Sequence, residues 1–124
     1  MIDHVSISVR DLEAGSRFYE AALAPLGYLR LREQDGTVGF GKQYPELWLN
    51  PRPKMQPDPE TGAHISFRAR DTASVDAFHA AALAAGGRSD GAPGMRSHYH
   101  ETYYAAFIRD PDGNRVEAVT FVKA

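Results

Sequence analysis

Two histidines and one glutamate are the residues of this sequence best suited to holding a divalent metal ion. His4 and His64 each open a short run in which apolar and polar residues alternate, and Glu117 lies in the last such run. The chain has no cysteine, so a metal would have to be held by imidazole, carboxylate or water. Two imidazoles and one carboxylate leave coordination positions open for a substrate or for dioxygen. Each of these residues, taken alone, also fits an ordinary structural position.

A second group of candidates lies in the segment Ser97–Tyr104, which reads SHYHETYY. His98, His100 and Tyr103 are the candidates for acid and base catalysis, because such side chains donate and accept protons and imidazole does so near neutral pH. If the segment is extended, the two histidines share one face and look into the mouth of a pocket. The alternative is that they are exposed loop residues without a catalytic role.

Aromatic side chains form a third group. Trp48, Phe40 and Phe107 are the candidates for a substrate pocket, because their rings could stack on a flat or apolar ligand. The same rings could equally belong to the hydrophobic core, and the sequence leaves both interpretations open.

An internal repeat relates the two histidines. Residues 4–28 match residues 64–88 at a constant shift of 60 without a gap, and this alignment places His4 on His64. Equivalent residues of two duplicated halves lie near one axis when the halves close on each other. The sequence therefore predicts that the two imidazoles come close together.

Each half is predicted to begin with a strand and a helix. From each histidine onward, apolar and polar residues alternate strictly, which gives the strand one aliphatic face and one polar face. Asp11 and Asp71 are suited to cap the helices that follow, and the helices should end near Gly27 and Gly86. Because the aliphatic face must pack on a helix, the polar face is expected to line the concavity between the halves.

Three further strands are expected after each helix. In the last of them, Val116 and Ala118 would face the helix, which turns Glu117 toward the same concavity as the histidines. The order of strand, helix and three strands therefore occurs twice. The further strands expected from the sequence are Tyr28–Gln34, Thr37–Gly41, Leu47–Asn50, Tyr103–Arg109 and Arg115–Phe121.

A proline-rich stretch separates the two halves. Four prolines within residues 51–62 remove backbone donors and forbid a regular helix, so this stretch is predicted to be a linker. Halves of this size are too small to be comfortably stable alone. We expect a single domain over residues 1–124, with module 1 at about 1–50 and module 2 at about 63–124.

Composition limits the class of protein. The chain has 124 residues, of which 43% are hydrophobic and 24% charged, as in an ordinary globular domain. A formal net charge of -2 offers no basic surface for nucleic acid or for an anionic membrane. The sequence has neither a secretory signal pattern nor an apolar stretch long enough to span a bilayer, so a cytoplasmic location and a small-molecule partner are expected.

The sequence resembles the vicinal oxygen chelate superfamily, which is glyoxalase/bleomycin resistance protein/dioxygenase-like. The resemblance rests on the motifs HVSI from His4, HISF from His64 and DPDGNRVE from Asp110, and it covers nearly the whole chain. It implies an α+β fold in which two tandem βαβββ modules form an incomplete, cup-shaped mixed β-barrel with the helices outside. Small members of this kind commonly pair, so a homodimer is expected.

The resemblance also implies a metal site. The family's ligands lie on the first and fourth strands of each module, which corresponds here to His4, His64 and Glu117 and to a place near Trp48. Because an indole cannot bind a metal, we expect three protein ligands, with Glu46 as an alternative fourth. The ion, which could be Zn, Ni, Mn or Fe, would bind neighbouring oxygens of a substrate and stabilise an enolate or oxyanion.

Two functions follow from the resemblance. The first is a metal-dependent lyase, isomerase or dioxygenase, and a site of two histidines and one glutamate is more similar to the dioxygenase arrangement than to the four-ligand site of glyoxalase I. The alternative is a non-catalytic protein of the bleomycin-resistance type that sequesters a small molecule. In that case the aromatic residues bind the ligand, and the histidines and the glutamate are simply hydrogen-bonded.

Overall fold

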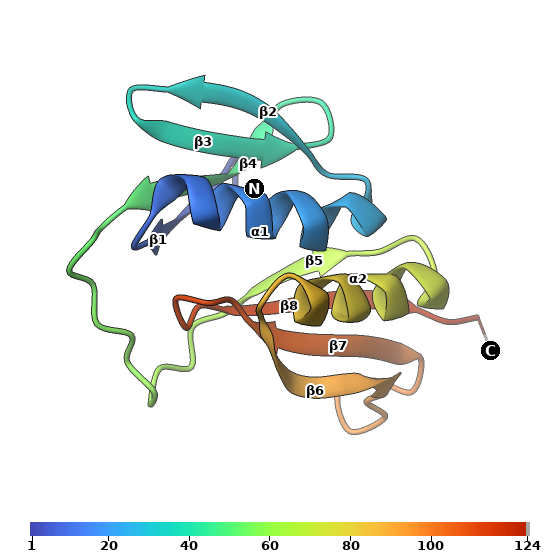
Figure 1. Cartoon of the computed structure of the whole chain (residues 1–124). Helices are drawn as coiled ribbons and strands as arrows, with labels where there is room; N and C mark the ends of the chain where they lie inside the picture. Colours follow the sequence, from blue (N-terminus) through green and yellow to red (C-terminus); the bar gives the residue numbers. More distant parts are fainter. Residues whose placement is uncertain (124) are drawn as a thin grey trace.

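The computed structural model describes residues 1–123 and contains two βαβββ modules (Figure 1). The predicted α+β fold is confirmed. Module 1 comprises β1 (Val5–Val9), α1 (Leu12–Leu23), a short 3-10 helix (Ala24–Leu26), β2 (Leu29–Gln34), β3 (Thr37–Gly41) and β4 (Pro45–Pro51). Module 2 comprises β5 (Ile65–Arg68), α2 (Thr72–Ala84), β6 (Arg88–Met95), β7 (Tyr103–Arg109) and β8 (Arg115–Phe121).

Each module forms one four-stranded mixed sheet. The strand orders are β1-β4-β3-β2 and β5-β8-β7-β6. In module 1, α1 carries the chain back so that β2 can run in the direction of β1, and two reversals then give β4 that direction as well, which makes the β1–β4 pair parallel. Module 2 repeats this pattern in the parallel β5–β8 pair. Within residues 1–123 no strand ladder joins the two sheets, so the arrangement is open and cup-like rather than a closed barrel.

Side-chain caps and glycines set the helix ends as the sequence predicted. The carboxylate of Asp11 accepts a hydrogen bond from the backbone N–H of Ala14 at 2.8 Å, and Asp71 caps α2 in the same way. The turn after α1 ends at Gly27, whose φ of 83° lies in the left-handed region that favours glycine. Within the described part of the chain, no helix has the length and apolar character needed to cross a membrane.

The sequence predicted the bounds of most strands but not those of β6. The predicted bounds of β3, β7 and β8 agree with the structure, and those of β2 and β4 differ by one to two residues at their ends. Strand β6 contains Pro93 and two glycines, and its pairing with β7 shifts register twice. Proline and glycine are tolerated there because β6 is the edge strand of its sheet.

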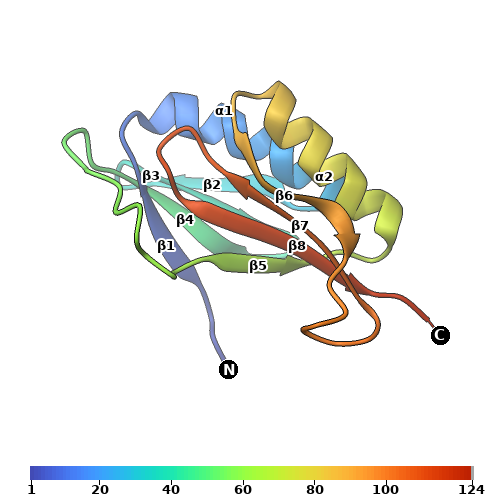
Figure 2. The ribbon, with the colours of Figure 1, turned by 90° about the horizontal axis from the view of Figure 1, so that it is seen from below.

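The helices join the two modules into one body. Helices α1 and α2 contact each other, and a single core cluster contains residues of both modules. The rings of Tyr28 and Phe67 meet edge to face across the two modules at a centroid distance of 5.1 Å. Figure 2 shows both helices on one side of the molecule, with β1 and β5 toward the other. The polar faces of both sheets therefore point away from the shared core.

A buried carboxylate strengthens this connection. The Tyr19 hydroxyl on α1 donates a hydrogen bond to Asp110 Oδ2 at 2.6 Å, and the Asn114 side chain donates to Asp110 and to the carbonyl of Ser8 on β1. Burial raises the pKa of Asp110 although these bonds oppose the shift, and burial also raises the pKa of Tyr19 well above 10. The turn between β7 and β8 is thus tied to module 1 through groups that are shielded from water.

Candidate functional site

Three polar side chains meet on the face of the module 2 sheet that points away from the core. On β8, Val116 and Ala118 lie in the core, so Glu117 points to the opposite face of the sheet. Oε1 of its carboxylate lies 3.1 Å from Nε2 of His64. Oε2 accepts a hydrogen bond from the hydroxyl of Tyr103. The site therefore combines a carboxylate from β8, an imidazole from the segment before β5 and a phenol from β7.

Glu117 is the most enclosed member of this group. Only 2% of its surface is exposed, and a carboxylate removed from water needs donors or a cation. His64 and Tyr103 supply these partners. Burial and the hydrogen bond to Glu117 raise the pKa of Tyr103 to about 12, so its hydroxyl remains a donor at neutral pH. Chemically, the group can bind a cation through one nitrogen and one carboxylate oxygen, or pass a proton between them.

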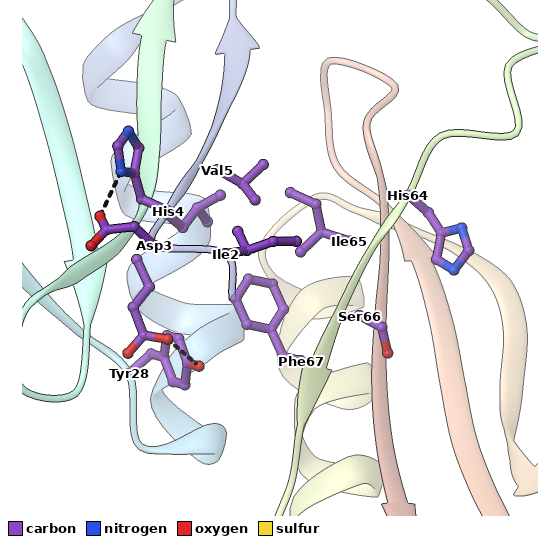
Figure 3. Close-up of a pocket in the computed structure, with 11 residues that line it drawn as sticks. Ile2, Asp3, His4, Val5, Tyr28, His64, Ile65, Ser66 and Phe67 are labelled. Atoms are coloured by element: carbon purple, nitrogen blue, oxygen red, sulfur yellow. Dashed lines mark hydrogen bonds and ion pairs between the residues drawn. The ribbon is translucent and has the colours of Figure 1, made fainter.

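His4 does not join this group within one chain. Its ring is exposed, and Nδ1 lies 2.7 Å from Oδ1 of Asp3. His4 and His64 both border a hollow of about 370 Å³ between β1 and β5, but their side chains point away from each other (Figure 3). Among residues 1–123 no three His, Asp or Glu side chains lie close enough together to hold a metal ion. The two modules join through their helix-covered sides, and this arrangement separates the polar faces that carry the histidines.

Strand register explains the position of Trp48. Ser6 pairs with Trp48 in module 1, and the equivalent Ser66 pairs with Glu117 in module 2. Trp48 therefore occupies in module 1 the place that the glutamate occupies in module 2. Glu46 lies two residues earlier on the same face and accepts a hydrogen bond from the hydroxyl of Tyr28 at 3.1 Å. Burial and this contact raise the pKa of Tyr28 to about 12.

The histidines before β7 lie in a turn rather than in an extended strand. The backbone N–H groups of Tyr99 and His100 both donate to the carbonyl of Arg96. The His98 ring contacts that of Tyr99 at a tilt of 51°, with ring centroids 4.2 Å apart, and His100 lies beside Thr102, with Nδ1 3.0 Å from its hydroxyl oxygen. Because the segment turns, the two histidines do not share the strand face that an extended chain would give them.

The three aromatic candidates lie in different surroundings. Phe40 has no exposed surface and packs in the core, 6.3 Å from the ring centroid of Tyr19. Trp48 and Phe107 are half-buried, and the Phe107 ring lies 6.5 Å from that of His64. Of the three, only Trp48 and Phe107 offer surface to a ligand.

The chain was compared with known families and solved structures. The model of the glyoxalase/bleomycin resistance protein/dioxygenase superfamily matches residues 1–118. The chain belongs to this superfamily. No curated protein matches it. A glyoxalase/bleomycin resistance protein from Albidiferax ferrireducens T118 shares 32% identity over 94% of both chains, with a TM-score of 0.79.

Two further crystal structures share the superfamily fold at lower identity. A glyoxalase/bleomycin resistance protein/dioxygenase family enzyme from Burkholderia phytofirmans PsJN is 21% identical over 98% of both chains, with a TM-score of 0.76. A glyoxalase/dioxygenase from Nostoc punctiforme is 20% identical over 99% of this chain and 92% of its own, with a TM-score of 0.74. The name of the superfamily covers both enzymes and binding proteins, so membership alone does not specify a reaction.

In this member of the superfamily, sequence reasoning missed one polar residue beside the site. Arg115 stands two residues before Glu117 on β8, and its guanidinium borders the same polar face as His64. The signal was present in the alternation of β8, because residues i and i+2 of a strand point to the same side.

Proposed function

We propose that this protein is a glyoxalase/dioxygenase-like metalloprotein that uses a divalent ion to chelate neighbouring oxygens of a small-molecule substrate. The observation that supports this most strongly is the buried carboxylate of Glu117, with Nε2 of His64 3.1 Å from Oε1. A nitrogen and a carboxylate oxygen at that separation can both turn toward one cation, and these donor types suit Zn, Ni, Mn or Fe. Membership of the superfamily gives independent support.

One chain offers two of the donors that such an ion needs. We therefore propose that a second copy of the chain supplies the third, His4, when module 1 of one copy faces module 2 of the other in a homodimer. Glu46 is a candidate fourth donor because it stands on β4 beside His4, in the register that pairs Val5 with Leu47. The exposure of His4 in the single chain is consistent with this role.

The chain's own residues would each have a defined task. His64 and Glu117 hold the cation, and Tyr103 orients Glu117 by donating to its second oxygen. Phe107 and Trp48 provide flat apolar surface for the substrate. His98 and His100 remain the candidates for moving protons at the mouth of the site. A bound divalent ion would supply Lewis-acid polarisation of the substrate oxygens.

A binding protein of the bleomycin-resistance type is the second candidate. It is favoured by the observation that the buried carboxylate of Glu117 has two polar partners within the chain, His64 and Tyr103. In that function the cleft and its aromatic rings would bind a small molecule, and the polar group would only maintain the shape of the site.

Metal retention distinguishes the two functions. On the metalloprotein proposal, the full-length protein dialysed against zinc retains the metal and gains thermal stability. His64→Ala should weaken zinc retention at least about tenfold without unfolding the protein, because His64 lies outside the core. His79→Ala is the matched control, since His79 lies on α2 and its ring contacts Ser89 instead. A wild type that binds no zinc, or a His64→Ala variant that retains it fully, would favour the binding protein.

A further inference from the structure

Two arginines lie near Glu117 on the polar face of module 2. Arg115 and Arg109 pair in register on β8 and β7, so both guanidinium groups lie on that part of the sheet. Asp90 of β6 is the acid between them. Its carboxylate is 3.7 Å from Nε of Arg109 and 3.8 Å from Nη1 of Arg115. Both distances are too long for hydrogen bonds, so Asp90 accepts none from either guanidinium.

Arg115 also has a donor without a partner. Its Nη2 donates to the carbonyl of Pro59 at 3.0 Å, and Nε is buried without an acceptor among the residues that the structure describes. Within that part of the chain, Nη1 has only the Asp90 carboxylate at 3.8 Å, beyond hydrogen-bond distance. A ligand cannot reach the buried Nε, but an acceptor atom brought by a ligand can accept from Nη1.

The guanidinium borders a hollow with aromatic walls. The hollow has a volume of about 200 Å³ and is bordered by Arg115, Asp90, His64, Tyr99 and Phe107. His64 links it to the carboxylate of Glu117, so a molecule seated here reaches the proposed metal site. The rings of Phe107 and Tyr99 present flat apolar surface, which suits a planar group better than a tetrahedral one.

We propose that this hollow binds the carboxylate of a flat, apolar small-molecule acid, with Arg115 as its anchor. An anionic oxygen accepts from Nη1–H of Arg115, while the body of the acid packs on Phe107 and Tyr99. As the substrate class of the site, this rests on the proposed function. The anchoring contact itself involves no metal, so it can be measured separately.

Benzoate is the probe, with benzamide as its neutral counterpart and inorganic phosphate as the tetrahedral anion. The full chain, treated with chelator, is titrated with each while the Nε–H resonances of the arginines are followed by NMR. Benzoate should bind saturably and move the Arg115 resonance, and benzamide and phosphate should bind at least about tenfold more weakly. Arg115→Gln should weaken benzoate binding at least about tenfold, which corresponds to about 1.4 kcal/mol.

Two further variants complete the test. Arg17→Gln removes the same charge from an exposed site on α1 and should leave benzoate binding unchanged. Arg115→Lys keeps the charge but lacks the guanidinium N–H donors, and should also bind benzoate more weakly than the wild type. It serves in place of Arg115→Gln if that variant fails to fold. Unchanged affinity in the folded Arg115 variants, or equal binding of benzamide or phosphate, would overturn the proposal.

The benzoate and zinc experiments test the anion site and the metal site separately. Benzoate binding by a protein that retains no zinc would support the anion site and reject the metalloprotein. Zinc retention that depends on His64, without benzoate binding, would overturn the anion site and leave the proposed function standing.

Discussion

The bond between Tyr19 and Asp110 tests whether the two modules are held together as the structure shows. The Tyr19 hydroxyl is 2.6 Å from Asp110 Oδ2, and the two residues are only 1% and 3% exposed. Tyr19→Phe removes this donor and little else. A hydrogen bond to a charged group contributes about 1.5–3 kcal/mol, and here screening by water is weak. For a chain of 124 residues, such a loss lowers the melting temperature by roughly 5–15 °C.

The assay is urea unfolding followed by circular dichroism, with Tyr28→Phe as the control. Tyr28 also donates to a carboxylate, that of Glu46, but is less buried, so its loss should cost less. A double-mutant cycle of Tyr19→Phe with Asp110→Asn should give a coupling of about 0.5–3 kcal/mol. A loss below about 0.5 kcal/mol in Tyr19→Phe, or additive effects in the cycle, would refute this account of the junction.

Three further predictions concern stability. Asp71→Ala should cost about 1 kcal/mol in urea unfolding, because the backbone N–H of Ser74 loses its cap; an unchanged midpoint would contradict this. Gly87→Ala should cost about 1–3 kcal/mol, because a Cβ there would lie 2.9 Å from the carbonyl oxygen of Arg109; a neutral effect would show that the turn yields easily. Burial raises the pKa of Asp110 above its ordinary 3.8. The contribution of Asp110 to folding stability is therefore largest below pH 3.8 and is lost as pH rises through the raised pKa. The stability of the wild type relative to Asp110→Asn should therefore increase as pH falls through that range, and a flat difference from pH 7 to 4 would contradict the shift.

Local pattern was sufficient to predict most of the fold. Alternation from His4 and His64 gives β1 and β5, and the capping aspartates give the starts of α1 and α2, because these features depend on residues close together in the chain. Strand β6 was missed because its glycines and Pro93 hide the alternation. The sequence left the segment before β7 open between an extended strand and a loop, because its turn depends on the carbonyl of Arg96 accepting from two N–H groups.

The candidate site was only partly predictable. The pair of Glu117 with His64 followed from the faces of β5 and β8, and the structure brings these two together. The separation of His4 from them did not follow, because it depends on how α1 packs against α2. That packing involves side chains far apart in the sequence, and duplication alone does not determine which surfaces of the two halves meet.

Mixing two defective chains tests the proposed shared metal site most directly. His4→Ala and His64→Ala would each damage every site in their own dimers, so each variant alone should retain little zinc. After subunit exchange, half of the randomly paired dimers are mixed, and each mixed dimer rebuilds one intact site of two. An equal mixture should therefore regain about a quarter of the wild-type zinc content. If the mixture retains no more zinc than the separate variants although subunits have exchanged, His4 and His64 do not meet across the dimer, and the shared site is contradicted.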